Sequence, residues 1–569
     1  MKKNTILNKG IPVSISLEPI LDAENFEPVQ KENKQRILTI SAIAFLIAVA
    51  MCFISKILVY LINLITNISF YGKLSIEHSS PADNSLGIFV IIIPAIGGVI
   101  VGLMALYGSK AIRGHGIPEA MEQILTNQSK IKPSITYLKP LSAAISIGTG
   151  GPFGAEGPII ATGGALGSMI GQFLKITHNE RKILLTAGAT AGMSAIFGSP
   201  IAAIFLAIEL LLFEFSPRSI IPVAIACITG AAGHHLFFGQ EPVFAMPDLS
   251  PSGNTALILY SVMGIIIGCL SVLVTKAVYF IEDNFEKLPI HWMWWPALGG
   301  LIVGAVGYFS PHTLGVGYDN ITDILSGSIP VKVVLSLCIL KFISWAVALG
   351  SGTSGGTLAP LLTIGGATGA LLGTAIIYLF PESGITIPLA ALVGMSALFA
   401  GASRALLTSI VFALETTSQS NAMLPLLGAC LASYFVSFFL MKNTIMTEKI
   451  ARRGVKTPHS YEPDILEKIT VAEVMNKNES LQWEDLITLK SVYIGVDDSL
   501  RTAVELMAKE DVELLAIISR EDKKNIIGVL SYKNVLSAYK QDMEEYKKNS
   551  PAISLKRKRL RMLVRYRNK

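Results

Sequence analysis

The sequence holds one carboxylate in a setting where a charge is expensive. Glu156 stands in the segment Gly-Ala-Glu-Gly-Pro and is the only charged residue between Lys139 and Lys175. A carboxylate at membrane depth costs at least a few kcal/mol, so an acid inside a membrane segment indicates a functional site. The alternative is that Glu156 only caps the N-terminus of a helix. Leu358 argues against that alternative, because it occupies the duplicate of this position and keeps the same glycine and proline pattern without a carboxylate.

Glycine and proline mark three predicted helix starts around this carboxylate. Residues 154–158 and 356–360 each place glycine before a helix and proline just inside it, and residues 114–118 (Gly-His-Gly-Ile-Pro) do the same. Proline suits a first helical turn, where its missing N–H costs nothing. The free N–H groups and the helix dipole favour an anion there. These segments contain no Lys or Arg, which favours passage of an anion over tight capture. Close contact between small residues of membrane helices is the alternative for the glycines alone.

The two strongest of these segments belong to an internal duplication. Residues 148–167 and 350–369 share eight of twenty positions at an offset of 202, and residues 192–197 match 394–399 in the same frame. We therefore predict two repeat halves, 37–240 and 254–445. Transporters built from repeats bind their substrate near the midplane, where broken helices of the two halves meet. The sequence does not show whether the halves are parallel or inverted.

The elements that must position these residues are membrane helices. The chain has 569 residues, of which 51% are hydrophobic and 15% charged, whereas soluble domains have about 25% charged residues. A spanning helix needs about 20 apolar residues. The clear candidates are 37–67, 87–107, 218–238, 254–280, 293–309, 331–349 and 423–441. Glycine and proline interrupt four further apolar stretches, which therefore predict broken helices that line a cavity: 140–171, 181–213, 350–380 and 386–416. We predict an all-α polytopic membrane protein.

Polar segments flank this membrane domain of 37–450. A polar segment of 1–36 precedes it, and a linker of 451–468, a mixed α/β unit of 469–540 and a basic tail of 541–569 follow. Residues 554–569 carry eight Lys or Arg and no acid, which accounts for the net charge of +6. We interpret the tail as a cytoplasmic flank against anionic lipid, not as a nucleic-acid site. Both termini are expected to be cytoplasmic and the protein to lie in a bacterial inner membrane. The five cysteines show no CxxC spacing, so no disulfide framework and no metal site is predicted.

These motifs resemble those of the ClC family of chloride channels and chloride/proton antiporters, over 37–450 and the C-terminal unit. GHGIPEA resembles the family's first motif, GAEGP its second and GTLAP its third. The resemblance implies an inverted repeat of broken and tilted helices, and a homodimer with one pore in each subunit. It places Glu156 on the gating glutamate. The anion-binding positions that it implies are His115, Gly116, Ile117, Glu156, Gly157, Thr357, Leu358 and Met446.

The gate implied by the resemblance has a simple physical basis. An ionised Glu156 is a tethered anion that can occupy the same positive site as chloride and block the path. Protonation, or displacement by chloride, then moves the side chain away. Burial and the helix N-termini act in opposite directions on such a carboxyl, which makes a titratable gate plausible.

Three positions depart from the family pattern. The first motif usually carries a serine ligand and here has His115, and the family's central tyrosine corresponds to Met446. The loss of both side-chain ligands leaves the anion selectivity open. The inner proton-transfer glutamate of the antiporters corresponds to Leu210, which cannot relay protons. His115 is open to three roles: an N–H donor to the anion, a proton relay, or a packed ring.

The sequence therefore predicts chloride transport through a glutamate-gated pore that is channel-like or weakly proton-coupled. The alternative is a coupled chloride/proton antiporter with a different proton path. An intramembrane enzyme is disfavoured, since the histidines form no HExxH motif, and a non-conducting scaffold would not need Glu156.

The unit of 469–540 resembles a cystathionine-β-synthase (CBS) regulatory domain. Nucleotide-binding copies often end in Ser/Thr-x-x-Asp, and this chain has Ser531 and Asn534 at those ends. Adenosine nucleotide is thus a candidate ligand there, and no other cofactor is predicted. The alternative role is to stabilise a dimer or to direct trafficking.

Overall fold

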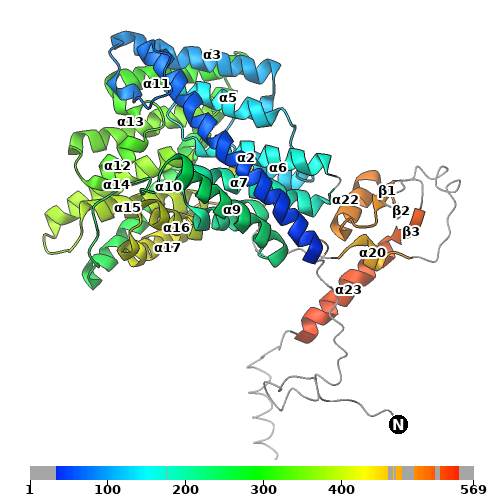
Figure 1. Cartoon of the computed structure of the whole chain (residues 1–569). Coiled ribbons are helices and arrows are strands. Elements are labelled where there is room, and N and C mark those ends of the chain that lie inside the picture. The colour runs from blue at the N-terminus through cyan, green and yellow to red at the C-terminus, as the bar shows by residue number, and fades with distance from the viewer. Residues whose placement is uncertain are drawn as a thin grey trace, which may run out of the picture.

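The computed structural model describes residues 34–174, 176–458, 466, 469–476, 492–518 and 526–549, the last nine of these without side chains. The chain forms a large helical body, and a small α/β unit follows it in sequence and stands beside it (Figure 1). Almost all of the predicted segment 1–36, much of the linker 451–468 and the tail beyond 549 lie outside the described residues.

The helical body consists of two sets of eight helices in the same order, followed by the short α18 (Glu448–Arg452). The first set is α2 (Lys34–Thr66), α3 (Ile92–Tyr107), α4 (Ile117–Thr126), α5 (Ile135–Gly148), α6 (Glu156–Phe173), α7 (His178–Phe197), α8 (Pro200–Leu206) and α9 (Pro217–Phe237). The second set is α10 (Asn254–Glu286), α11 (Trp295–Phe309), α12 (Tyr318–Ser326), α13 (Val331–Gly350), α14 (Leu358–Leu379), α15 (Ile387–Ser403), α16 (Leu406–Thr417) and α17 (Met423–Leu440).

Eight helices in the described part of the chain are long and apolar enough to cross a membrane. Seven of them confirm the spans predicted from the sequence. The eighth, Leu358–Leu379, corrects the prediction that 350–380 contains no clean span. The chain breaks only at the glycine-rich turn after α13, and beyond that turn the apolar residues run on as one helix.

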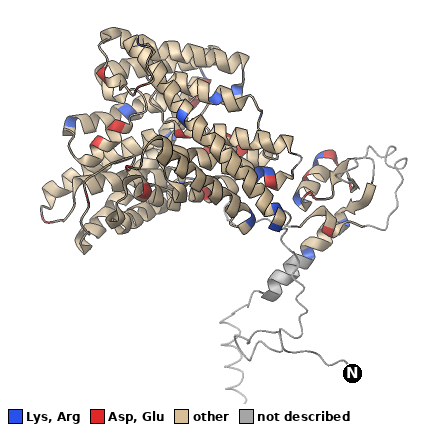
Figure 2. Ribbon diagram, viewed as in Figure 1, with Lys and Arg blue, Asp and Glu red and all other residues tan. Residues whose placement is uncertain are grey.

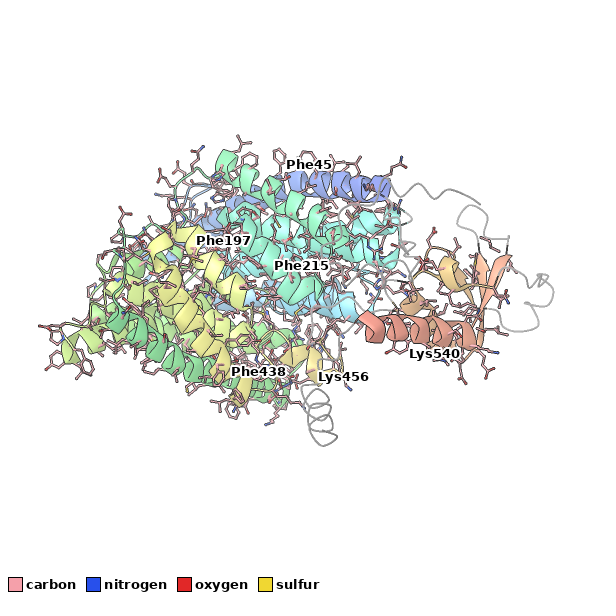
Figure 3. The ribbon with its side chains drawn as sticks, turned by 90° about the horizontal axis from the view of Figure 1, so that it is seen from below. Phe45, Phe197, Phe215, Phe438, Lys456 and Lys540 are labelled. Carbon is pink, nitrogen blue, oxygen red and sulfur yellow. The ribbon has the colours of Figure 1, made fainter. Side chains whose placement is uncertain are left out.

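The outside of the helical body is apolar. Phe45 and Phe438 are 46% and 58% exposed and lie at its margin, as Figure 3 shows. Long stretches of its helices carry no charged side chain (Figure 2). Such a surface is stable against lipid tails and costly in water.

The two sets of helices are related by reciprocal contacts. Glu209, near the end of the first set, accepts hydrogen bonds from the amides of Leu407 and Thr408 at the start of α16, at 2.9 and 3.0 Å. Glu415, near the end of the second set, accepts from the first amides of α8 at 3.0 and 2.8 Å. Each carboxylate thereby satisfies free N–H groups and the positive end of a helix dipole in the other half. A two-fold axis between the halves would produce such a pair of equivalent contacts.

The C-terminal unit is a three-stranded sheet with helices. Strand β1 (Tyr493–Gly495) pairs parallel with β2 (Leu514–Ile518), which pairs antiparallel with β3 (Ile526–Ser531). The helices are α20 (Val471–Val474), α22 (Leu500–Glu510) and α23 (Tyr532–Asn549). This order confirms the α/β pattern read from the sequence. Helix α23 runs past the predicted boundary at 540, because residues 541–549 are mostly good helix formers.

Candidate functional site

The structure brings the three predicted helix starts together. The turn before α4 pairs with the turn before α14, through hydrogen bonds from Gly114 N to Thr353 O (3.3 Å) and from Gly355 N to Gly114 O (3.4 Å). The turn before α6 also pairs with that turn, through Gly154 and Gly356, at 3.4 and 3.0 Å. The N-termini of α4, α6 and α14 therefore meet in one small region.

Two glycines permit this approach. Gly116 has φ +97°, which is the left-handed region that favours glycine. A Cβ atom on Gly157 would collide with the carbonyl oxygen of His115 and would lie 2.9 Å from the Cα of Gly356. Both obstacles are backbone atoms, so a side chain at 157 would push the three turns apart.

Glu156 lies at the centre of this junction. It is the first residue of α6 and is fully buried. Its Oε1 accepts a hydrogen bond of 2.9 Å from the hydroxyl of Tyr318, at the start of α12. Its Oε2 lies against Gly154 and Gly356 and has no hydrogen-bond partner among the described residues. The carboxylate thus occupies the place where free helix N–H groups and dipoles would attract an anion.

Two cavities approach the junction. One, of about 740 Å³, is bordered by His115, Gly116 and Ala161, and the other, of about 120 Å³, by Ala155 and Tyr318. Glu156 directly follows Ala155 in the chain, and Ala161 lies further along the same helix. Residues that border different cavities therefore flank Glu156 in the chain.

The large cavity is predominantly basic. It is lined by seven Lys or Arg residues and by four Glu residues, a balance that raises the local concentration of anions. One of the glutamates, Glu119, forms an ion pair with Lys449 at 2.9 Å. It also accepts a hydrogen bond of 2.7 Å from the amide of Gly116. The basic residues are Lys110, Arg113, Lys130, Lys132, Lys139, Lys449 and Arg453.

An exposed ion pair lines the small cavity. His78 Nε2 lies 3.1 Å from Asp319 Oδ2, and both side chains are more than half exposed. The hydrogen bond to Asp319 raises the pKa of His78, and the same bond lowers the pKa of Asp319.

Two buried lysines, which were not predicted from the sequence, support the turns before α4 and α12. Lys139 on α5 and Lys341 on α13 are both almost completely buried. Each donates to two carbonyls of one turn at 2.7–3.0 Å: Ile112 and Gly114 for the first, Thr313 and Gly315 for the second. The sequence did contain a sign that these two lysines correspond, because 341 − 139 = 202 is the offset of the duplication.

Replacing Lys341 by methionine is expected to destabilise the protein by about 1–3 kcal/mol, because two buried carbonyls lose their donor. Lys332→Met is the matched control, since Lys332 is an exposed lysine on the same helix. Thermal unfolding of both variants in detergent checks the prediction. Equal melting temperatures for the two variants would contradict it.

The other predicted anion ligands differ in how the structure uses them. Thr357 precedes α14 and its buried Oγ1 has no partner among the described residues, and Leu358 is the first residue of that helix. His115 is 4% exposed and its Nδ1 likewise has no described partner. The amide of Gly116 donates to Glu119, whose carboxylate folds back over the helix start. Anion binding at Gly116 remains a prediction.

Two further predicted positions, Met446 and Leu210, lie away from these contacts. Met446 is fully buried and its amide donates to Thr444 Oγ1 at 3.2 Å; no described hydrogen bond joins it to the three turns. Leu210 is 3% exposed in a π-helical turn, Ala207–Leu212. Glu214, four residues on, pairs with Lys182 at 3.7 Å.

In the C-terminal unit, Ser531 and Asn534 hydrogen-bond to each other, and Asn534 also donates to the carbonyl of Val474 at 3.2 Å. Nucleotide binding by these two residues remains a prediction.

Comparison with known proteins identifies the family. Residues 96–438 match the family model described as voltage gated chloride channel, and this match covers more than half of the chain. The chain belongs to the voltage-gated chloride channel (ClC) family. Residues 471–541 match the CBS domain, at nearly the predicted boundaries.

Named relatives of this ClC protein include H(+)/Cl(−) exchange transporters. The ClcA transporter of Yersinia pestis bv. Antiqua (strain Angola) is 31% identical over 355 residues, which are 60% of this chain and 73% of the relative. ClcA of Salmonella paratyphi B (strain ATCC BAA-1250 / SPB7) is 30% identical over 63% of this chain and 80% of its own length.

Solved structures share the fold of this ClC protein. A slow cyanobacterial Cl−/H+ antiporter matches with a TM-score of 0.64 and 23% identity, over 72% of this chain and 98% of its own. A eukaryotic CLC transporter matches with a TM-score of 0.61 and 18% identity, over 88% and 98%. The predicted fold class is confirmed: a ClC membrane domain followed by a small α/β CBS domain. The protein is an integral membrane protein of an anion-transporting family.

Proposed function

We propose that this ClC protein is a chloride/proton antiporter gated by Glu156. The observation that carries the proposal is a fully buried carboxylate at the meeting point of three helix N-termini, between positions that border two cavities. The names of the relatives also support exchange, so we now prefer the coupled alternative to the channel-like function first predicted from the sequence.

The proposed cycle uses one positive site for two anions in turn. Ionised Glu156 occupies the helix N-termini and closes the path between the cavities. Chloride that arrives through the basic cavity competes for the same N–H groups, those of Glu156, Gly157, Thr357 and Leu358. When Glu156 takes up a proton, its attraction to the site falls and chloride replaces it. Each swing of the carboxyl then carries a proton one way while chloride moves the other way.

The proton must reach Glu156 by a route that avoids Leu210. A buried aliphatic side chain has no atom that can accept or donate a proton. His115 is the first candidate for the route, because it borders the large cavity and its Nδ1 has no described partner. A chloride channel is the second candidate function. It is favoured by the presence of Leu210, because a channel needs no proton-transfer group at that position.

Flux from liposomes distinguishes these two functions. Protein in liposomes loaded with chloride, in a low-chloride buffer, is expected to release chloride and to drive protons inward, so that the external pH rises. The measurement follows external chloride and pH together. Chloride release without proton uptake, with a reversal potential at the chloride equilibrium value, would instead establish a channel.

We further propose a homodimer with a pore in each subunit and with both termini in the cytoplasm. The basic tail supports this orientation through the positive-inside rule. Cross-linking in native membranes and protease access to the tail from the cytoplasmic side test the two points separately.

A further inference from the structure

The two halves of the membrane domain have the same order of helices but differ at two side chains that touch. Glu156 begins α6, and its duplicate, Leu358, begins α14 without a carboxylate. Tyr318 begins α12, and Ile117 begins α4 without a hydroxyl. The hydroxyl and the carboxylate that break the repeat are joined by the 2.9 Å hydrogen bond between Tyr318 and Glu156.

The duplication extends to the turn that presents Tyr318. Residues 315–318 (Gly-Val-Gly-Tyr) stand where the first half has 114–117 (Gly-His-Gly-Ile), at an offset of 201. Gly116 and Gly317 each precede the helix with a positive φ, +97° and +78°. Lys341 donates two hydrogen bonds to carbonyls of the turn before α12, as Lys139 does to the turn before α4. The backbone that places Tyr318 is therefore as firmly held as the junction itself.

Aromatic contacts hold the ring of Tyr318. Its centroid lies 5.8 Å from that of Phe197 and 6.0 Å from that of Phe244, both in edge-to-face geometry. Phe197, which Figure 3 labels within the helical body, and Phe244 are almost completely buried. A ring packed in this way loses little further freedom when its hydroxyl donates a bond. Tyr318 also borders the small cavity, whereas His115 and Gly116 border the large one.

We propose that Tyr318 is a latch, a positioning residue whose hydroxyl holds ionised Glu156 in the closed position on the side of the small cavity. The proposal rests on the proposed function of Glu156 as the gate. A phenol donates well to a carboxylate, and bonds to charged groups are the stronger class. The bond is weaker when Glu156 is protonated, so the latch releases the gate when the proton arrives.

Tyr318→Phe removes the hydroxyl and keeps the ring. Chloride flux through the variant in liposomes is expected to rise about tenfold near neutral pH, because the closed state loses a bond to a charged group. The acid activation of flux is expected to shift by about one pH unit to higher pH. Tyr308→Phe, which alters an exposed tyrosine on α11, is the control and should leave the profile unchanged.

Other titratable groups surround the junction and contribute to any pH profile. They are His115 and Glu119 on the side of α4, Lys139 on α5, Lys341 on α13, and Asp319 of α12 with its partner His78. A double variant separates them from the latch. In a Glu156→Gln background all of these groups remain, and Tyr318→Phe is expected to change the flux by less than about twofold, since the charge that the hydroxyl holds is gone.

Each result of these flux measurements either supports or overturns the proposed latch. A pH profile of Tyr318→Phe equal to that of the unaltered protein would overturn the latch while leaving the transport function intact. An equal effect of Tyr318→Phe with and without Glu156 would also overturn it, since the tyrosine would then act on the fold. Unaltered protein that moves no chloride would overturn the proposed function and the latch with it. Thermal unfolding of Tyr318→Phe verifies that the variant is folded before its flux is compared.

Discussion

Replacing Glu156 by glutamine is expected to abolish proton transport while chloride transport continues. Glutamine has nearly the same shape but cannot carry a proton through the cycle, and it has no charge to compete with chloride for the helix N-termini. Proton uptake driven by a chloride gradient should fall by at least about tenfold. Chloride flux should lose its dependence on pH, and the reversal potential should move to the chloride equilibrium value. Parallel recordings of chloride and pH from liposomes check both parts.

Asp323→Asn is the matched control for Glu156→Gln. It removes a carboxylate from an exposed position on α12, and both transport activities should remain at the level of the unaltered protein. If Glu156→Gln still drives protons uphill, the gate lies elsewhere and the burial of Glu156 serves only the fold. If instead both ions stop, the carboxylate is needed to shape the path and not only to close it.

Replacing Gly157 by alanine is expected to cause the largest loss of chloride flux among small substitutions. The added methyl group would collide with the carbonyl of His115 and lie 2.9 Å from the Cα of Gly356, so the turns before α4 and α14 must both retreat. Overpacking of this kind costs about 1–3 kcal/mol. A displacement of the ligand groups by about 1 Å can cost on the order of a hundredfold in rate. Initial rates of chloride efflux, per protein incorporated, measure the loss.

Gly253→Ala tests whether this loss is specific to the junction. Gly253 lies before α10 with φ −71° and has no atom within 4 Å of an added Cβ, so alanine should be tolerated there. The circular dichroism of both variants establishes that the helices have formed. Gly157→Ala with the full flux of the unaltered protein would mean that the three turns need not meet for transport.

Much of the fold follows from local patterns in the sequence. Seven spans were predicted from runs of apolar residues, because about 20 consecutive apolar residues are long enough to cross the hydrocarbon core of a membrane. The helix starts within 114–118, 154–158 and 356–360 were predicted from glycine and proline, whose backbone preferences act locally. The repeat halves came from the 202-residue offset, which needs only the order of residues.

The contacts of the site were not predictable in the same way. Nothing in the sequence around Lys139 and Lys341 distinguishes them from other lysines. In the structure each donates hydrogen bonds to the carbonyls of a turn. The hydrogen bond from the amide of Gly116 to the side chain of Glu119 likewise has no counterpart in the sequence pattern. Such bonds depend on rotamers and on backbone geometry that no spacing in the sequence specifies.

From the sequence alone, this is a duplicated membrane protein with a carboxylate, Glu156, inside a membrane segment and three predicted helix starts. Hydrophobicity, backbone preference and the repeat are properties of neighbouring residues or of residue order. The convergence of those helix starts, and the groups that contact the carboxylate, follow from the folded structure. Tyr318 is 162 residues from Glu156 in the chain, and the 2.9 Å bond between them exists because the second half folds back against the first. Side-chain contacts across such a distance depend on how the helices pack, and packing is a property of the whole membrane domain.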